Sequence, residues 1–252
     1  MAPAPGFTTF LAVGCHQLAK KSHIKSGGQA TTGLIQRMTN TSLINYSLYT
    51  KADADEMSQL LGDVFAHRDP PAVAVGLSAA EFESFVRLYC QKADAEGLTF
   101  VARSAATGEM IGALLAEDSA SVPPEGLDRV SPKFNPIIDI LGELDVEYSG
   151  GRLRQPGESL HLFLLGVAQG FGGRGVAQRL VAECAAHGGR KGYKVAVTEA
   201  TNKTSQQVFR KQGFVERVRR SYNDHLFEGQ ALFRSIADQG GPMLMDRRLA
   251  PA

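Results

Sequence analysis

The chain has 252 residues, of which 43% are hydrophobic, and a formal net charge of +1 at pH 7. This length and composition predict one large or two small globular domains with a sizeable buried core. The near-neutral charge, without a dense Lys/Arg stripe, excludes a nucleic-acid surface. No apolar run is long enough to span a membrane, so we expect no membrane partner. The three cysteines have neither disulfide nor metal-ligand spacing, which predicts reduced thiols, no metal and a cytoplasmic protein.

The first 40 residues differ in composition from the rest of the chain. No Asp or Glu occurs before Asp53, and the segment is rich in Gly, Ser, Thr and Ala. A polar segment with so little apolar surface predicts a disordered N-terminal extension over residues 1–40, followed by a single domain over residues 41–252. Two alternatives stay open for the extension: an organelle transit peptide, or a start of translation at Met38.

Strands and helices then alternate along the chain. Hydrophobic periodicity and turn residues predict, in order, a strand at 44–50, a helix from about 53 that ends before 68, a helix at 79–96, hairpin strands at 98–104 and 110–117, a strand at 160–167, a helix at 174–187, a strand at 194–200, a helix at 203–211, and strands at 214–220 and 243–249. The sequence RDPP at 68–71 ends the first helix, because proline cannot continue it. Ser78 and Glu81 form a capping box for the second helix, and Gly97 ends it.

Residues 118–159 interrupt this alternation. The segment contains five prolines and one short predicted helix at 136–144. A long irregular insertion of this kind is typical of a lid or a functional loop. We therefore expect it to cover a binding site.

A glycine-rich turn follows the strand at 160–167. The residues are Gly172, Gly173, Arg174, Gly175, Val176 and Ala177, and an apolar-periodic helix follows at once. Such a turn exposes the unpaired N–H groups and the positive dipole end of a helix, which together bind anions such as a pyrophosphate. It is neither a dinucleotide fingerprint nor a Walker loop. Taken alone, it is equally typical of a tightly packed turn.

The wider context of this turn matches a known family. The segment VAQGFGGRGVAQRL, followed by EATNKTSQQVFRKQGF, resembles the acetyl-CoA-binding region of the GNAT superfamily of acyl-CoA N-acyltransferases. In that superfamily a strand leads into R/Q-x-x-G-x-G/A, and a later Asn precedes a helix that ends in Gly-Phe. Here the first motif is residues 172–177, the Asn is Asn202, and the helix ends at Gly213-Phe214. The resemblance implies an α/β fold of GNAT type, with a mixed, mostly antiparallel central sheet splayed at the acetyl-CoA site and helices on both faces.

The resemblance also assigns residues to the cofactor. By similarity, the residues that bind acetyl-CoA are Leu165, Gly166, Val167, Gly172, Gly173, Arg174, Gly175, Val176, Ala177, Asn202 and Ser205. A β-bulge at Gly166 is expected to splay the two strands for the pantetheine arm and to free the N–H of Val167 or its neighbour for the oxyanion.

Two positions depart from the family pattern. Gly172 stands where an Arg or Gln usually contacts phosphate. Phe209 stands where many members carry a Tyr that protonates the departing thiolate. The first departure removes one phosphate contact, and the second leaves the source of that proton open.

Within the superfamily the chain is most similar to arylalkylamine and dopamine-type N-acetyltransferases. The cues are RDPP at 68–71, where that family has an acidic residue followed by Pro, together with the segments KFNPIIDIL and SYNDHLFEGQ. The strand at 160–167 also resembles one that bears two histidines in serotonin-acetylating members. His161 matches the first of these, and Phe163 replaces the second.

An amine acceptor requires a base, because an alkylammonium with a pKa of about 10.4 cannot attack a thioester. The candidates are Asp69, His161, Glu199, Asp224 and His225. The resemblance at RDPP favours Asp69, although a capping carboxylate is equally compatible with that turn. His161 is either a base that titrates near neutrality or a hydrogen-bonded strand histidine. Glu199 lies at the carboxyl end of a strand, where ligands bind in such sheets, or is a surface carboxylate.

We therefore expect an N-acetyltransferase that transfers an acetyl group from acetyl-CoA to a primary amine of a small molecule, of arylalkylamine or polyamine type, by direct attack in a ternary complex. No cysteine is placed to carry an acyl intermediate. The alternatives are a protein lysine or N-terminal acetyltransferase, and an acyl-CoA-binding sensor without catalysis. We expect a monomer or homodimer, a small-molecule amine as partner, and no metal.

Overall fold

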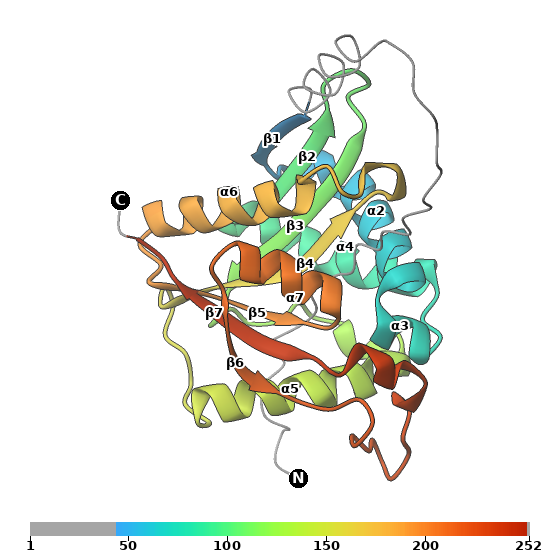
Figure 1. The fold of residues 1–252 in the computed structure, drawn as a ribbon. Helices are drawn as coiled ribbons and strands as arrows, with labels where there is room; N and C mark the ends of the chain where they lie inside the picture. Colours follow the sequence, from blue (N-terminus) through green and yellow to red (C-terminus); the bar gives the residue numbers. More distant parts are fainter. Residues whose placement is uncertain (1–43, 251–252) are drawn as a thin grey trace, which may run out of the picture.

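The computed structural model describes residues 44–250, which form a seven-stranded sheet with helices on both faces (Figure 1). The predicted extension at 1–40 and the alternative start at Met38 lie outside the described residues. The elements are β1 (Ile44–Leu48), α2 (Ala54–Arg68), α3 (Pro70–Ala74), α4 (Ala79–Glu96), β2 (Phe100–Ser104), β3 (Met110–Asp118), α5 (Asn135–Ser149), β4 (Ser159–Val167), α6 (Val176–Arg190), β5 (Val195–Ala200), α7 (Lys203–Lys211), β6 (Val215–Arg219) and β7 (Met243–Arg248).

The sheet has the strand order β1-β2-β3-β4-β5-β7-β6. Every neighbouring pair is antiparallel except β4 and β5, which are parallel. Helices α2, α4 and α5 contribute to an apolar cluster on one face, and α6 and α7 contribute to a second cluster on the other (Figure 1). The predicted mixed, mostly antiparallel sheet with helices on both faces is confirmed.

The two parallel strands separate after a short paired stretch. They pair over three positions, the last being His161 with Val197, although β4 continues to Val167 and β5 to Ala200. The predicted splay is therefore present in the sheet. It leaves the last residues of both strands facing a gap rather than each other.

The bulge expected at Gly166 lies elsewhere, so that prediction is wrong in position. Gly166 pairs in regular register with Ala113, whereas the register between β3 and β4 shifts at Phe163. Gly166 has a packing role instead, because a Cβ there would lie 2.6 Å from Cδ2 of Leu61 on α2. The bare backbone lets α2 approach β4 closely.

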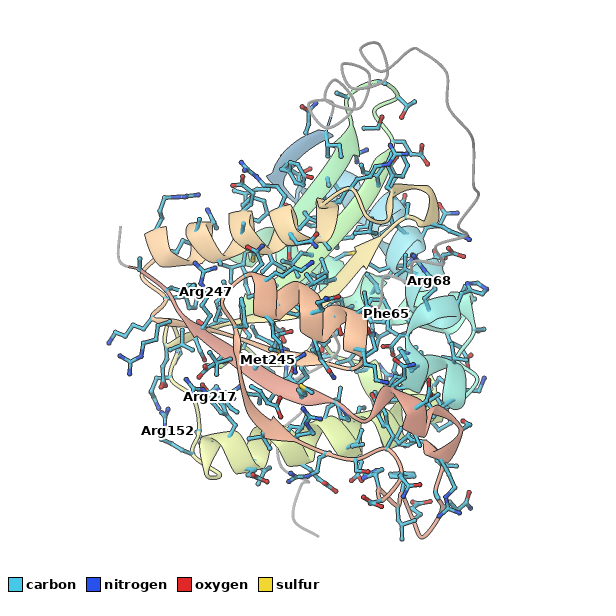
Figure 2. All side chains as sticks on the ribbon, viewed as in Figure 1. Phe65, Arg68, Arg152, Arg217, Met245 and Arg247 are labelled. Atoms are coloured by element: carbon cyan, nitrogen blue, oxygen red, sulfur yellow. The ribbon has the colours of Figure 1, made fainter. Side chains whose placement is uncertain are left out.

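The RDPP turn ends α2 as predicted, at Arg68, which is labelled in Figure 2. A short helix that the sequence did not indicate, α3, begins directly at Pro70. Proline suits this first position because its fixed φ is already helical and its missing N–H would have had no helical partner. Asp69 therefore lies between two helices, as the C-cap of α2 and the N-cap of α3.

The insertion at 118–159 is not a lid. Its helix, α5, runs from Asn135 to Ser149 and is longer than the helix predicted at 136–144. Its apolar face, which includes Ile137, Ile140 and Leu144, is fully buried in the core on the α2 and α4 side of the sheet. The proline-rich composition hid an amphipathic helix whose packing supplies its stability.

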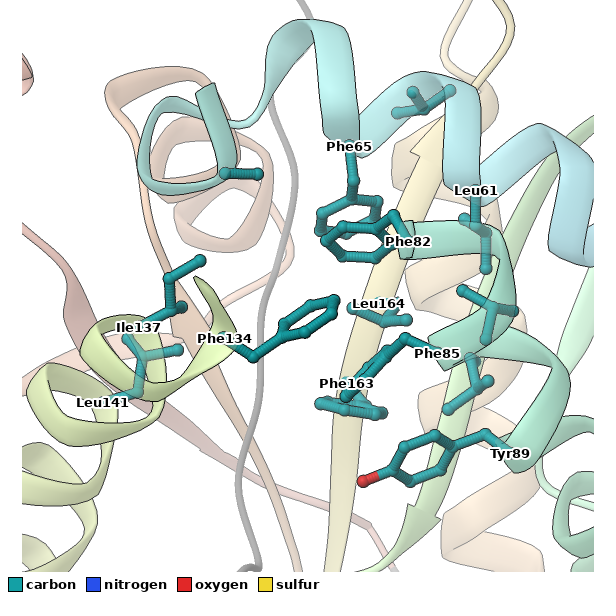
Figure 3. Close-up of a cluster of buried hydrophobic side chains, with 14 of the residues drawn as sticks. Leu61, Phe65, Phe82, Phe85, Tyr89, Phe134, Ile137, Leu141, Phe163 and Leu164 are labelled. Atoms are coloured by element: carbon teal, nitrogen blue, oxygen red, sulfur yellow. The ribbon is translucent and has the colours of Figure 1, made fainter. Parts of the chain in front are cut away.

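Six aromatic side chains of the predicted helices and strands are core residues. All six are buried: Phe65, Phe82, Phe85, Tyr89, Phe163 and Phe209. Five of them form a continuous group with Phe134 between α2, α4, α5 and β4 (Figure 3). The stacked pairs Phe65–Phe82 and Phe85–Phe134 each have ring centroids 4.5 Å apart. The group fixes α2, and hence Asp69 at its end, against the sheet.

Helices α2 and α4 approach each other at a glycine. A Cβ on Gly62 would lie 2.9 Å from the carbonyl oxygen of Ala79 and 3.0 Å from the backbone nitrogen of Glu83. Both atoms belong to the α4 backbone, which cannot move as a side chain can. The contact therefore requires a residue without a side chain.

We expect Gly62→Ala to lower the free energy of unfolding by about 1 kcal/mol or more, because overpacking costs roughly 1 to 3 kcal/mol and exceeds the gain in helix propensity. Gly142→Ala on α5 is the matched control, since a Cβ there meets nothing within 4 Å. It should raise the free energy of unfolding by about 1 kcal/mol. Urea unfolding measures both values, and equal shifts in the two variants would contradict the close approach of α2 and α4.

Candidate active site

The glycine-rich turn opens onto a cavity of about 410 Å³. The lining residues are Val167, Phe171, Gly173, Gly175, Val176, Ala177, Gln178, Thr204, Gln207, Val208 and Lys211. They come from the end of β4, the turn, the start of α6 and one face of α7. The cavity therefore lies at the N-terminus of α6, where the predicted anion site was placed.

Two glycines give the turn its shape. Gly173 and Gly175 have φ values of +74° and +80°, a left-handed conformation that glycine adopts without steric cost. Gly175 is the N-cap of α6 and offers no side-chain hydrogen bond to the first helical N–H groups. Those groups therefore remain donors for an anion. The Arg174 guanidinium lies over the Phe171 ring, 5.0 Å from its centroid.

The α7 side of the cavity was missed in the sequence. Thr204, Gln207, Val208 and Lys211 all line it. They follow one another at i, i+3, i+4 and i+7, which is the spacing of a single helix face. That signal was available, but the face is mostly polar and therefore resembles an ordinary solvent-exposed surface. Lys211 adds the positive charge that Gly172 does not supply.

The structure gives Asn202 and Ser205 a local role. The Asn202 side chain accepts hydrogen bonds from the N–H groups of Thr204 and Ser205, at 3.0 and 2.9 Å. The Ser205 hydroxyl donates in turn to the Asn202 carbonyl at 3.0 Å. Both residues are buried, and neither lines the cavity. They form the capping box that starts α7 and so set the position of its cavity-facing side chains.

The free edge of β4 carries backbone donors. The N–H of Ala168 donates to Ile111 at 2.9 Å, and Gly166 pairs with Ala113. Since N–H groups alternate in direction along a strand, those of Leu165 and Val167 point away from β3 and toward the gap beside β5. Val167 also lines the cavity, so these donors lie where the cavity meets the splay.

Arg68 and Asp69 connect the two diverging strands. The Arg68 guanidinium donates to the Val167 carbonyl on β4 at 2.5 Å. The next residue, Asp69, accepts a hydrogen bond of 2.6 Å from the Thr201 hydroxyl, just beyond β5. The C-terminal end of α2 therefore lies across the open end of the splay (Figures 1 and 2).

Asp69 is a fully buried carboxylate without a cationic partner among its hydrogen bonds. Its Oδ2 accepts from the N–H of Ala72 at 3.2 Å, and its Oδ1 accepts from Thr201. Burial raises the pKa of Asp69 to about 7, against the lowering effect of these two hydrogen bonds. A carboxylate with this pKa exchanges a proton near neutral pH.

A tyrosine from the segment between β6 and β7 contacts this region. The Tyr222 hydroxyl donates to the Thr201 carbonyl at 2.7 Å, and the side chain is fully buried. Burial raises the pKa of Tyr222 well above its usual value. Thr201 therefore links the two residues: its hydroxyl donates to Asp69, and its carbonyl accepts from Tyr222.

His161 lies between two carboxylates from neighbouring strands. Its Nδ1 is 3.1 Å from Glu117 on β3, and its Nε2 is 2.9 Å from Glu199 on β5. Burial alone would lower the pKa of His161, but the two carboxylates override this effect and raise it to about 9. Of the two alternatives for His161, the hydrogen-bonded strand histidine is the one present, and a titration near neutrality is not, since a protonated imidazole with both nitrogens engaged accepts no proton.

This ionic group extends beyond the histidine. Glu117 is also paired with the Lys92 ammonium of α4, and the pKa of Glu117 is lowered because His161 and Lys92 outweigh its burial. Glu199 is fully buried, and its Oε1 has no hydrogen-bond partner among the described residues. The alternative that Glu199 is a surface carboxylate is therefore wrong.

None of the five base candidates lines the cavity, and the remaining two, Asp224 and His225, also lie outside the hydrogen bonds at the splay. Asp224 is exposed, and hydrogen bonds from Ser221 and Asn223 lower its pKa. His225 is buried against α5, near Asp139 and Glu143. Neither residue lines the cavity or contacts Asp69.

The region that contains this site matches a known protein family. Residues 66–214 match the sequence profile of the acetyltransferase (GNAT) family, which is more than half of the chain. The matched region contains Asp69, β4, the glycine-rich turn and α7. Among curated protein sequences, none matches the chain significantly. None of the helices within residues 44–250 has the length and apolar content needed to cross a membrane.

Solved structures with the same fold include N-acetyltransferases and a condensation domain. The C-terminal condensation domain of Ebony, solved with β-alanyl-dopamine, has a TM-score of 0.75 at 14% identity, covering 82% of this chain and 99% of that chain. Arylalkylamine N-acetyltransferase 2 from Aedes aegypti has a TM-score of 0.65 at 19% identity, covering 81% and 98%. The Drosophila melanogaster polyamine N-acetyltransferase that forms N-acetylagmatine has a TM-score of 0.63 at 19% identity, covering 82% and 100%. The predicted GNAT-type fold, similar to the arylalkylamine type, is confirmed.

The raised pKa of Asp69 predicts a pH-dependent stability. Between about pH 4 and pH 7 the folded state retains a proton that the unfolded state has released, so the free energy of unfolding contributed by Asp69 falls as pH rises. Asp69→Asn stays neutral and should lose less stability than the wild type between pH 5 and pH 7.5. Chemical denaturation at the two pH values measures this difference. Asp63→Asn, on the exposed side of the same helix, should lose as much stability between the two pH values as the wild type does. If Asp69→Asn also loses as much stability as the wild type, the raised pKa is contradicted.

Proposed function

The chain belongs to the acetyltransferase (GNAT) family, and from this premise we propose that it transfers the acetyl group of acetyl-CoA to a primary amine of a small molecule. The observation that carries the proposal is the position of Asp69. It is a buried carboxylate with a pKa of about 7, held at the splay between β4 and β5, and the preceding residue, Arg68, contacts Val167 of the cavity lining. This arrangement brings a base close to a site suited to a phosphorylated donor.

The cavity supports binding of the pyrophosphate of acetyl-CoA. The first N–H groups of α6 and the helix dipole would stabilise its negative charge. Lys211 would add one cation from α7, in place of the side chain that Gly172 lacks. The bare backbone at Gly173 and Gly175 leaves room for the phosphates. The pyrophosphate also remains assigned to Gly172, Arg174, Val176 and Ala177. Asn202 and Ser205 would act on it indirectly, because they set the position of α7.

The gap between β4 and β5 supports binding of the pantetheine arm. The N–H groups of Leu165 and Val167 would pair with it as a neighbouring strand would. One of them would also stabilise the oxyanion that forms when the thioester carbonyl is attacked. Gly166 contributes by letting α2 lie close to this edge.

Asp69 would act as the general base. An alkylammonium with a pKa of about 10.4 must transfer a proton to a group with a pKa of about 7, which costs roughly 4 to 5 kcal/mol at 1.36 kcal/mol per unit. The neutral amine then attacks the thioester carbonyl, and the bond from carbon to sulfur breaks. Phe209 is buried against Phe214 and has no proton to give, so the thiolate must take its proton from another source.

Direct transfer is supported by the position of the thiols. Among residues 44–250 the cysteines are Cys90 and Cys184, both buried, and neither lines the cavity. Burial also raises the pKa of Cys184, which disfavours the thiolate. A ternary complex of donor, amine and protein therefore fits better than an acyl-enzyme.

A small amine is favoured over a protein substrate. Tyr222 is fully buried and donates to Thr201, the partner of Asp69, so both sides of this carboxylate are enclosed by side chains rather than open to a long substrate. Buried acidic groups at the carboxyl end of β5 would attract a cationic acceptor. Solved proteins of the same fold include ones described as arylalkylamine and polyamine N-acetyltransferases, and one that holds β-alanyl-dopamine.

We expect Lys211→Ala to weaken acetyl-CoA binding by about tenfold or more, because a charge-assisted hydrogen bond contributes roughly 1.5 to 3 kcal/mol. Isothermal titration calorimetry measures the Kd. Lys203→Ala is the matched control, since Lys203 lies on α7 but does not line the cavity. If both variants bind as the wild type does, the phosphates do not lie against α7.

Asp69→Asn should lower turnover on the order of a hundredfold, the lower part of the range for loss of a general base, with little change in the Kd for acetyl-CoA. The assay is release of free CoA from acetyl-CoA against a panel of arylalkylamines, polyamines, amino acids and peptides. The wild-type rate should rise with pH through about 7 as Asp69 ionises. That rise should be absent in Asp69→Asn.

Two outcomes would overturn these assignments. If Asp69→Asn keeps full turnover while Glu199→Gln abolishes it, the base is Glu199. If only peptides accept the acetyl group, the small-molecule assignment fails. His161→Gln should change the free energy of unfolding but hardly change the pH profile of turnover, because His161 stays protonated up to about pH 9.

A further inference from the structure

We propose that Asp139, Glu143 and His225 bind one divalent transition-metal ion, and that Zn²⁺ is the ion that fits best. The three residues lie away from the acetyl-transfer site. One ligand atom from each lies within 4.8 Å of the others. The site joins α5 to the segment between β6 and β7.

Two independent elements bring the three ligands together. Asp139 and Glu143 lie one turn apart on α5, so their carboxylates share one helix face. His225 lies opposite them, with Nε2 at 3.4 Å from Oδ2 of Asp139 and Nδ1 at 3.6 Å from Oε1 of Glu143. The carboxylate side chains are 47% and 45% exposed, so an ion can enter from solvent.

The buried histidine is the observation that points to a ligand. Its side chain is only 4% exposed, and Nε2 has no hydrogen-bond partner among the described residues. Buried polar atoms are almost always paired, so an orphaned nitrogen requires an explanation. Nε2 lies 3.4 Å from Oδ2 of Asp139 without a hydrogen bond between them, and Oε1 of Glu143 lies 3.6 Å from the other ring nitrogen, Nδ1. A cation between them would pair all three groups at once.

The spacing fits zinc. Zinc binds nitrogen and carboxylate oxygen at about 2.0 to 2.2 Å, which in a tetrahedron separates two ligand atoms by roughly 3.3 Å. The distance from Nε2 to Oδ2 of Asp139, 3.4 Å, lies close to this value, and the ligand atoms of all three residues lie within 4.8 Å of one another. Three protein ligands would leave a fourth position for water. Mg²⁺ and Ca²⁺ prefer more ligands, all of them oxygen.

The surroundings support the site on both sides. The second carboxylate oxygen of Glu143 accepts from Arg220 at 2.7 Å, which orients the carboxylate as an outer-shell partner would. The Phe233 ring lies 5.7 Å from the imidazole and shields its inner side from solvent. The expectation of no metal rested on cysteine and histidine spacing in the sequence, which cannot reveal ligands 82 and 86 positions apart.

A bound ion would tie to α5 the segment between β6 and β7, which contacts Thr201 beside Asp69. His225 follows three residues after Tyr222, whose hydroxyl donates to Thr201, the partner of Asp69. Binding to the native state alone would also raise its stability by mass action. The site is therefore placed to hold the segment between β6 and β7 against α5 without contacting Asp69 or Thr201.

The test is isothermal titration calorimetry of ZnCl₂ into the metal-free, untagged full chain. We expect one zinc ion per chain and a weakening of at least tenfold in Asp139→Asn and in His225→Gln, since even outer-shell partners contribute tenfold or more. Asp139→Asn changes an exposed side chain and should fold normally, so it decides the result if His225→Gln is unstable. Co²⁺ should give the visible absorption of a tetrahedral site in the wild type alone.

His67→Gln is the matched control. His67 and Asp63 form an exposed pair at i, i+4 on α2, with Nδ1 and Oδ1 3.2 Å apart. This variant should bind zinc as the wild type does. The proposal is overturned if the wild type binds no zinc at 100-fold excess, or if Asp139→Asn binds it with unchanged stoichiometry and affinity. Either result leaves the acetyltransferase proposal intact, because the two sites share no residue.

Discussion

The separation of β4 from β5 after His161 and Val197 is the constraint on which the candidate active site depends. If the two strands stayed paired, the N–H groups of Leu165 and Val167 would be used inside the sheet. Because the strands diverge, those donors face a gap that continues into the cavity at the α6 N-terminus. The C-terminal end of α2 then bridges the gap, because Arg68 donates to Val167 at the end of β4 and Asp69 accepts from Thr201 just beyond β5. One break in strand pairing thus brings donor site and base together.

The ionic group around His161 lies where that break begins. Glu117, His161 and Glu199 come from three neighbouring strands, so their contacts tie β3, β4 and β5 together at the last paired position. The pKa of His161 is raised from 6.5 to about 9. Its stabilising contribution is therefore complete below pH 6.5 and is lost as pH rises through 9. We interpret His161 as the residue that fixes the splay, while Asp69 at the open end is the proposed base. Both side chains are buried, so the charge of their partners decides the difference: His161 has two anionic partners, and Asp69 has only neutral ones.

Features set by local chemistry could be predicted from the sequence. The RDPP stop, the Ser78 capping box and the Gly97 end of α4 all follow from short-range rules, and all are present. Features set by tertiary contacts could not. The bulge lies at Phe163 rather than at Gly166, whose bare backbone instead accommodates Leu61. The charge of His161 depends on Glu117 and Glu199, 44 and 38 residues away. The cavity-facing side of α7 had the right spacing but an ordinary polar composition.

The most direct test of the account is backbone hydrogen exchange with and without acetyl-CoA. We expect slower exchange at Leu165 and Val167 on β4 and in the first turn of α6 when acetyl-CoA is added. Exchange along α5, on the opposite face of the sheet, should stay unchanged. Protection confined to α5 or to the segment after Tyr222, with none on β4, would contradict a donor site in the splay between β4 and β5.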